Sequence, residues 1–178
     1  MAIYFIRHGQ SEFNAAFQGD IDPLIFDAPL TQLGFEQASE ARKTIAELEI
    51  KRVIASPLTR ALQTANTIFD GIAPIEVRHG HHELLKYSGD VGRHPDALSV
   101  DFPDLSFGHL PPRWWYPHEG SEDLVPKEPE QVFQNRIANF VETLATIESE
   151  NVAIVGHGNA FQEVIGFMLQ NCQIHQYR

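Results

Sequence analysis

The chain holds a single cysteine, Cys172, among 178 residues, so it forms no internal disulfide. One thiol is typical of a reducing compartment. The sequence also lacks an apolar run long enough to span a bilayer. No basic stretch followed by an apolar export segment stands at its amino terminus. These absences predict a cytoplasmic protein without a membrane partner.

Basic residues are scarce as well, with 13 Lys and Arg against 24 Asp and Glu and a net charge of −11. Nucleic acids and anionic membranes require a basic surface, so the balance argues against both as the main partner. A small anionic substrate is still compatible with this charge, because a few arginines set the potential of one pocket whatever the global sign.

The length and the hydrophobic fraction of 43% predict one domain over residues 1–178. Short apolar segments predict strands at residues 2–6, 52–55, 75–77 and 151–155, with an edge strand at 173–177. Capping residues and helical spacing predict helices at 31–48, from the Ser56 N-cap to Gly71, at 130–147 and at 159–169. Alternating strands and helices predict an α/β three-layer sandwich, with a mostly parallel central sheet flanked by helices.

One stretch interrupts this alternation. Residues 79–129 contain most of the prolines and histidines and both tryptophans. We expect a lid-like insertion there, with short helical pieces, that forms a side wall of the site.

Three predicted strands lead into polar turns, at residues 7–9, 56–60 and 156–158. Ligands of open parallel sheets bind beyond the carboxyl ends of the strands, so the three turns should meet at one site. They would bring together two arginines and two histidines, a set that a bound dianion neutralises. A guanidinium binds phosphate oxygens in a planar fork, and a neutral imidazole can attack phosphorus. The glycines of these turns, Gly158 among them, fit positions where backbone passes close to a ligand.

These motifs resemble the histidine phosphatase superfamily, which includes the cofactor-dependent phosphoglycerate mutases. The resemblance is carried by Arg7-His8-Gly9 with Asn14, by Phe17-Gln18-Gly19-Asp20 with Pro29-Leu30-Thr31, by Ser56-Pro57-Leu58-Thr59-Arg60-Ala61, and by Val155-Gly156-His157-Gly158. It covers most of residues 3–70 and 128–168, in the order and at the spacing of the family.

The resemblance implies that His8 attacks phosphorus and forms a phosphohistidine, which water then hydrolyses. Arg7, Arg60 and His157 would hold the phosphoryl oxygens and stabilise the transition state. Ser11 and Asn14 would add neutral hydrogen bonds. Neither a metal nor another cofactor is required, because the arginines and His157 supply the positive charge.

The leaving oxygen needs a proton, and the family usually places a carboxylic acid after the third strand. Glu83 is the expected donor, and Asp90 is the alternative, because the glycine that commonly follows the family's glutamate is displaced here. A carboxyl group that faces a phosphate has its pKa raised, which suits an acid. Glu128 and Arg136 match a family pair that we expect to position the site.

Two features leave alternatives open. Trp114 and Trp115 are interpreted as packing anchors or as an aromatic wall for the substrate. The histidines at positions 79, 81 and 82 suggest a metal site, but the chain lacks the cysteines and the helical His-Glu-x-x-His frame of zinc sites. A solvated loop near an anionic substrate is the preferred interpretation.

The sequence therefore predicts a phosphomonoesterase that acts on a small phosphorylated metabolite or a phosphorylated protein. One alternative is a phosphoglycerate mutase-type phosphotransferase. It is disfavoured because those relatives carry a large insertion and a long carboxyl-terminal tail, whereas this chain stops about 20 residues after His157. A non-catalytic phosphate-binding protein is the second alternative, and a homodimer is compatible with the sequence.

Overall fold

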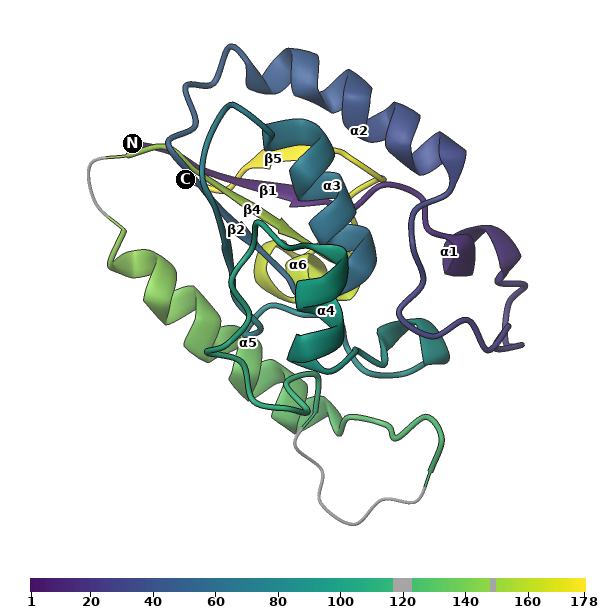
Figure 1. The fold of residues 1–178 in the computed structure, drawn as a ribbon. Coiled ribbons are helices and arrows are strands. Elements are labelled where there is room, and N and C mark those ends of the chain that lie inside the picture. Colours follow the sequence, from purple (N-terminus) through teal and green to yellow (C-terminus); the bar gives the residue numbers. More distant parts are fainter. Residues whose placement is uncertain (117–122, 148–149) are drawn as a thin grey trace.

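A computed structural model describes residues 1–116, 123–147 and 150–178 of the chain. Its centre is a five-stranded sheet in the order β3-β2-β4-β1-β5 (Figure 1). The strands are β1 (Ile3–Arg7), β2 (Arg52–Ala55), β3 (Ile75–Val77), β4 (Val152–Gly156) and β5 (Ile174–Gln176). Four strands are parallel, and only β5 runs antiparallel, beside β1 at the edge. The predicted α/β class with a mostly parallel sheet is confirmed.

Helices cover both faces of the sheet (Figure 1). In chain order, the helices of the described residues are α1 (Glu12–Ala16), α2 (Gln32–Ile45), α3 (Thr59–Phe69), the short η1 (Ser88–Asp90), α4 (Pro95–Asp101), α5 (Glu130–Ala145) and α6 (Gly158–Ile165). Side chains of a strand alternate between the two faces. Val53 and Ala55 therefore pack with α2 and α3, whereas Ile54 packs with α5 and α6.

The predicted strands match the structure to within one or two residues, but several helix ends differ, and α2 ends at Ile45 rather than at 48. Helix α3, predicted to begin at Pro57 after the Ser56 N-cap, begins at Thr59 after Leu58. The Ser56 hydroxyl lies 2.7 Å from Nε2 of His157 and accepts the Leu58 amide only at 3.5 Å, so it is not the N-cap of α3. Helix α6 ends at Ile165 rather than at 169, because Gly166 adopts a left-handed conformation with φ of +83°. Helix α1 was not predicted.

The insertion at residues 79–129 includes η1 and α4, and its residues 117–122 lie outside the described part. Its apolar side chains belong to the main core on the α3 face, namely Leu98, Phe102, Phe107, Leu110 and Trp114. The segment is thus anchored to the body of the protein by burial of apolar surface. Within the described ranges, the helices are all too short or too polar to traverse a bilayer.

Candidate active site

His8 follows β1 directly and is 2% exposed. Its Nδ1 lies 2.7 Å from the carbonyl oxygen of Gly9, and its Nε2 lies 3.2 Å from Nε of Arg60. A carbonyl only accepts, so Nδ1 carries the proton and Nε2 keeps its lone pair. Burial lowers the pKa of His8 well below its usual value, and the cations of Arg60 and Arg7 lower it further. The ring is neutral, as a nucleophile must be.

Arg60 is the second residue of α3 and is buried. Besides Nε, which faces His8, its guanidinium donates from Nη1 to the Gly89 carbonyl and from Nη2 to Asp90 Oδ1 at 3.0 Å. The arginine therefore joins the turn after β1 to η1 of the insertion. Its remaining N–H groups are the ones that a phosphoryl oxygen would use.

His157 follows β4, and its ring centroid lies 5.2 Å from that of His8. The two histidines, 149 positions apart in the chain, thus share one site, as the strand-end argument predicts. His157 Nε2 lies 2.7 Å from Ser56 Oγ, whereas its buried Nδ1 has no hydrogen-bond partner among the described residues. A buried polar atom of this kind is costly unless a ligand or water satisfies it.

The charge of His157 differs from the prediction. Burial lowers its pKa well below the usual value, and repulsion from Arg60 and His8 adds to this effect. The ring is therefore neutral in the unliganded protein and contributes a hydrogen bond rather than a positive charge. Arginines supply the cationic part of the site.

Arg7 ends β1, and its guanidinium lies beside the backbone of Gly158. A Cβ at Gly158 would stand 3.3 Å from Cζ of Arg7 and 2.5 Å from Sδ of Met168, so a side chain there would displace Met168 and press on the guanidinium. Arg7 Nη1 donates to the carbonyl of Leu169 at 2.6 Å. Its buried Nε has no partner in the described ranges.

Glu83 follows the β3 region and is 7% exposed. Its carboxylate accepts hydrogen bonds from the amides of Leu84, Asn159 and Ala160 at 2.9, 3.2 and 3.3 Å. Asn159 and Ala160 belong to the first turn of α6, where N–H groups and the helix dipole favour a negative group. The carboxylate is thereby held one residue from Gly158.

Asp90, the alternative donor, is equally buried and bonds to Arg60. Burial raises its pKa to about 6, against the attraction of Arg60, and the negative charge of Glu83 raises it further. Its Oδ2 also accepts the amides of Lys86 and Tyr87, at 3.3 and 3.0 Å. Both candidate acids therefore belong to one electrostatic cluster.

Arg136 of α5 holds the backbone at residues 80–83, which includes Glu83. Its guanidinium bonds to both carboxylate oxygens of Glu128, at 3.0 and 2.7 Å. It also donates to the carbonyls of Gly80, His82 and Glu83, at 3.1, 2.9 and 3.4 Å. This pair fixes the backbone that carries Glu83, which is the positioning role expected from the sequence.

Ser11 and Asn14 are engaged in local structure. The Ser11 hydroxyl accepts the Asn14 amide and the Asn14 side-chain oxygen accepts the Ser11 amide, each at 3.1 Å. This reciprocal capping box begins helix α1. Ser11 is buried and Asn14 is exposed. The structure thus gives both residues a helix-capping role, and substrate binding by them stays a prediction.

The loop of the histidine cluster, expected to be solvated, is instead packed into the protein, with His81 and His82 only 1% and 2% exposed. His81 stacks on Phe140 with ring centroids 4.5 Å apart, and both ring nitrogens of His82 contact carbonyls, those of His79 and Trp115. Trp114 is 2% exposed, and its Nε1 donates to the carbonyl of Arg93 at 2.9 Å. Trp114 is therefore a packing anchor. In the described part of the chain, no group of three or more His, Cys, Asp or Glu is arranged to hold a metal.

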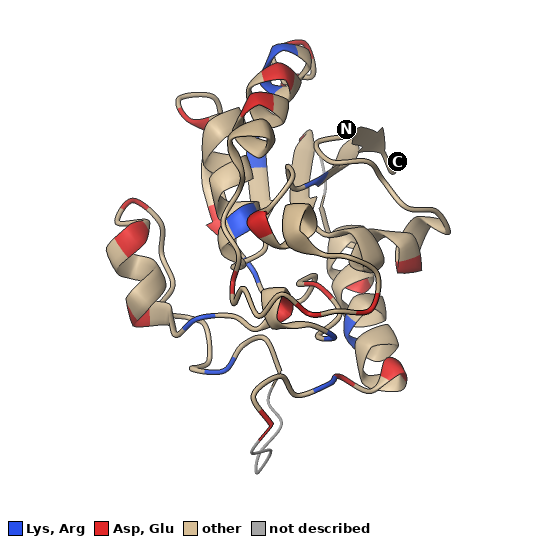
Figure 2. Cartoon of the chain, turned by 90° about the vertical axis from the view of Figure 1, so that its right-hand side faces the viewer, with Lys and Arg blue, Asp and Glu red and all other residues tan. Residues whose placement is uncertain are grey.

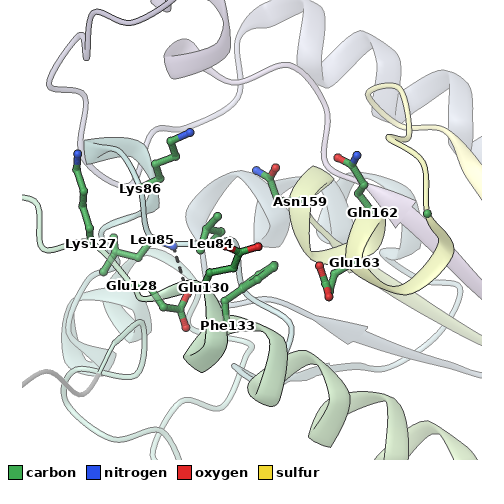
Figure 3. Close-up of a pocket in the computed structure, with 11 residues that line it drawn as sticks. Leu84, Leu85, Lys86, Lys127, Glu128, Glu130, Phe133, Asn159, Gln162 and Glu163 are labelled. Atoms are coloured by element: carbon green, nitrogen blue, oxygen red, sulfur yellow. Dashed lines mark hydrogen bonds between the residues drawn. The ribbon is translucent and has the colours of Figure 1, made fainter.

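A pocket of about 550 Å³ opens beside the cluster (Figure 3). It lies between α5, α6, residues 127–128 before α5 and residues 84–86 after Glu83. Its lining includes Leu84, Lys86, Lys127, Phe133, Asn159 and Gln162. Its lining does not include His8 or His157, but Leu84 and Asn159 directly follow Glu83 and Gly158. Sequence reasoning missed this pocket, because its walls come from segments that carry no motif.

Acidic positions are spread over many helices and loops of the molecule (Figure 2), whereas Arg7 and Arg60 gather at the strand ends. Glu83 and Asp90 lie close to these arginines, so the site combines two cations with two carboxyl groups inside a protein of net charge −11.

Comparisons with known proteins agree with this geometry. The family model described as "Histidine phosphatase superfamily (branch 1)" matches residues 3–178. A protein of Hydrogenobacter thermophilus with the provisional name phosphoserine phosphatase 2 is 26% identical over 165 residues, which are 92% of this chain and 76% of that one. An adenosylcobalamin/alpha-ribazole phosphatase of Salmonella typhimurium is 26% identical over 95% of this chain and 80% of its own.

Among solved structures, the alpha-ribazole phosphatase of Shigella flexneri superposes with a TM-score of 0.65 at 21% sequence identity. The match covers 98% of this chain and 88% of that one. At this identity the likeness establishes the fold.

Proposed function

The chain belongs to the histidine phosphatase superfamily, and we propose that it is a phosphomonoesterase that acts through a phosphohistidine at His8. One observation carries the proposal: His8, His157, Arg7 and Arg60 surround a single site. In that site, Nδ1 of His157 and Nε of Arg7 are buried without partners among the described residues. A phosphoryl group accepts hydrogen bonds from such donors and compensates both arginines.

In the first step, the lone pair of His8 Nε2 attacks phosphorus as the ester P–O bond breaks. The Nδ1–H bond to Gly9 holds the ring in the required tautomer and orientation. Arg7 and Arg60 stabilise the charge on the phosphoryl oxygens, and His157 Nδ1 donates to one of them. Glu83 is a carboxylate in the unliganded site, takes up a proton together with the substrate dianion and transfers it to the leaving oxygen, so the product is a neutral alcohol.

In the second step, water attacks the phosphohistidine. The Glu83 carboxylate accepts the proton of the water, the N–P bond breaks with its electrons returning to Nε2, and phosphate leaves. The chain's own residues supply the nucleophile, the charge stabilisation and the proton transfer. No step calls on a metal or another cofactor.

The substrate is a small phosphorylated molecule in this proposal, and the pocket beside Glu83 would hold its alcohol part. The relatives named above are phosphatases of phosphoserine and of alpha-ribazole by name, which supports the small-molecule class. Lys86 and Lys127 would attract anionic groups of the substrate and Glu130 and Glu163 cationic ones, and Leu84 and Phe133 offer apolar contact. We place this activity in the cytoplasm.

The direct test is hydrolysis of an aryl phosphate in the presence of a chelator. The wild-type protein should turn over, and His8→Ala should lose activity by about 10³-fold or more, because a nucleophile is not replaced by water at equal rate. Equal turnover of both proteins would remove His8 from the mechanism.

The two candidate acids are separated by leaving groups of different basicity. Glu83→Gln should slow alkyl phosphates by about 10²-fold or more and activated aryl phosphates far less, because only the alkoxide needs a proton. Asp90→Asn should show no such dependence on the leaving group. The reverse pattern would assign the acid role to Asp90.

A further inference from the structure

The loop at residues 18–30 places two aspartates against the two segments that fix Arg60. Asp27 is 4% exposed, and its Oδ1 accepts the Thr59 amide at 2.8 Å. Its Oδ2 accepts the Thr59 hydroxyl at 2.5 Å. Thr59 is the first residue of α3 and precedes Arg60, so Asp27 fixes the point from which the arginine side chain starts.

A second cation strengthens the contact at Asp27. Arg93 of the insertion donates from Nε to Asp27 Oδ2 and from Nη2 to the Thr59 hydroxyl, each at 2.8 Å. Asp27 itself adopts a φ of +40°, a conformation that L residues other than Asn and Asp rarely adopt. A buried carboxylate with this backbone is kept only where surrounding contacts determine it.

Asp22 fixes the other end of the arginine. Its Oδ2 accepts the Ser88 amide at 2.7 Å and its Oδ1 accepts the Ser88 hydroxyl at 2.5 Å. Burial raises the pKa of Asp22, but the bonds from Ser88 outweigh it and lower the pKa overall. Ser88 begins η1, whose next two residues provide the carbonyl of Gly89 and the carboxylate of Asp90 that bind Arg60.

We propose that Asp22 and Asp27 are positioning residues for Arg60, one at the root of its side chain and one at its guanidinium. The inference rests on the proposed function, since it concerns the arginine that would bind the phosphoryl group. A guanidinium fork is useful only when it is held in one orientation, because a misplaced fork forfeits its bidentate geometry. Neither aspartate contacts the substrate in this account.

The test compares Asp27→Asn and Asp22→Asn with Asp20→Asn, an exposed aspartate of the same loop. Asparagine tolerates positive φ, but in either orientation it loses at least one of the donors that the carboxylate accepts. We expect the dissociation constant of inorganic phosphate, measured by calorimetry, to rise about tenfold for Asp27→Asn and about threefold for Asp22→Asn. Asp20→Asn should change it less than about 1.5-fold.

The deciding measurement repeats these substitutions in an Arg60→Ala background. If the aspartates act through Arg60, their effect on phosphate affinity disappears there, whereas a general structural role would persist and add. Undiminished effects in that background, or none in the wild-type background, overturn the proposal. Thr59→Val, which removes only the hydroxyl contact, replaces Asp27→Asn if the latter unfolds.

A wild-type protein that binds no phosphate would count against the proposed function rather than against the positioning of Arg60. A crystal structure of Asp27→Asn then tests the positioning alone. Arg60 should leave Gly89 or Asp90 in that structure, and an unmoved guanidinium overturns the inference.

Discussion

Arg60, which is buried, and Arg136, which is half-buried, hold neighbouring parts of the insertion, yet they are bonded differently. Arg136 is bonded to both oxygens of Glu128 and to three backbone carbonyls. Arg60 is bonded to one carboxylate and one carbonyl, and it also faces the Nε2 of His8. The first arrangement satisfies a cation within the protein, whereas the second leaves donors for a ligand.

The same contrast extends to the histidines. Burial is the main cause that lowers the pKa of His8, His157 and His82. Repulsion from Arg60 is the second cause for His8 and His157, and repulsion from Arg136 is the second cause for His82. A phosphate dianion bound to Arg60 would reverse this effect only on the Arg60 side. Buried histidines are therefore not by themselves a sign of catalysis; the bonding of the neighbouring cation distinguishes the two groups.

The largest effect on activity is expected from the removal of the Arg60 guanidinium. Arg60→Ala should lower kcat/KM by about 10³-fold or more, in the range that an arginine at a transferring phosphoryl group contributes. Arg60→Lys should recover only part of this loss, since lysine keeps the charge but not the planar fork. Steady-state kinetics with an aryl phosphate measures both. A fall of less than tenfold for Arg60→Ala would contradict the assignment.

The Arg136 side should respond mainly in stability. Arg136→Met leaves the Glu128 carboxylate buried without its partner, which should cost about 3 kcal/mol of unfolding free energy in urea titrations. The double variant Arg136→Met, Glu128→Gln is the matched control and should regain most of that loss. If Arg60→Ala proves more destabilising than Arg136→Met, the distinction between the two arginines is lost.

Acid should destabilise the protein through the histidines. The histidines with lowered pKa values bind fewer protons in the folded than in the unfolded protein below pH 6.5, so stability falls as pH falls through that value; they are His8, His79, His81, His82 and His157. Each contributes up to about 1.4 kcal/mol at one pH unit below 6.5.

Asp90 acts in the opposite direction, because its pKa is raised to about 6 and its protonation at lower pH favours the folded state. The five histidines outweigh this single group. The Tm should therefore decrease between pH 7 and pH 5, and His157→Asn should reduce the slope. A Tm that rises over this interval would show that the histidines are charged in the folded protein.

The smallest effect is a proton count. Phosphate binding should raise the pKa of His8 and His157, so that up to about one proton is taken up near pH 6.5, and leave His82 unchanged. Calorimetry in buffers of different ionisation enthalpy gives the number of protons, and NMR titration assigns them. Proton uptake at His82 alone would place the bound phosphate near Arg136 instead of Arg60 and would contradict the proposed site.

The strand ends were predictable because their signals are local. An apolar strand followed at once by Arg7 and His8, or by His157, fixes where the side chains lie once the sheet is parallel. The contacts of Arg60 with Gly89 and Asp90 were not, since they depend on how a loop 30 residues away folds.

Competition for the same polar group explains the other differences. Ser56 was expected to cap α3 but lies closer to His157, and Ser11 and Asn14, whose contact with the substrate stays a prediction, cap α1. Asp27 carried no signal as a site residue, because its contacts with Thr59 and Arg93 arise only in the folded chain. Sequence patterns thus predicted which residues meet at the strand ends, and tertiary contacts determine how their side chains are oriented.

The most direct test is to trap the intermediate and find which atom is phosphorylated. Rapid quenching during turnover, followed by mass spectrometry under alkaline conditions and ³¹P NMR, should show phosphate on Nε2 of His8, because Nδ1 is bonded to Gly9. The label should be absent from His8→Ala. Phosphate on Nδ1, on His157 or on any other residue would contradict the mechanism.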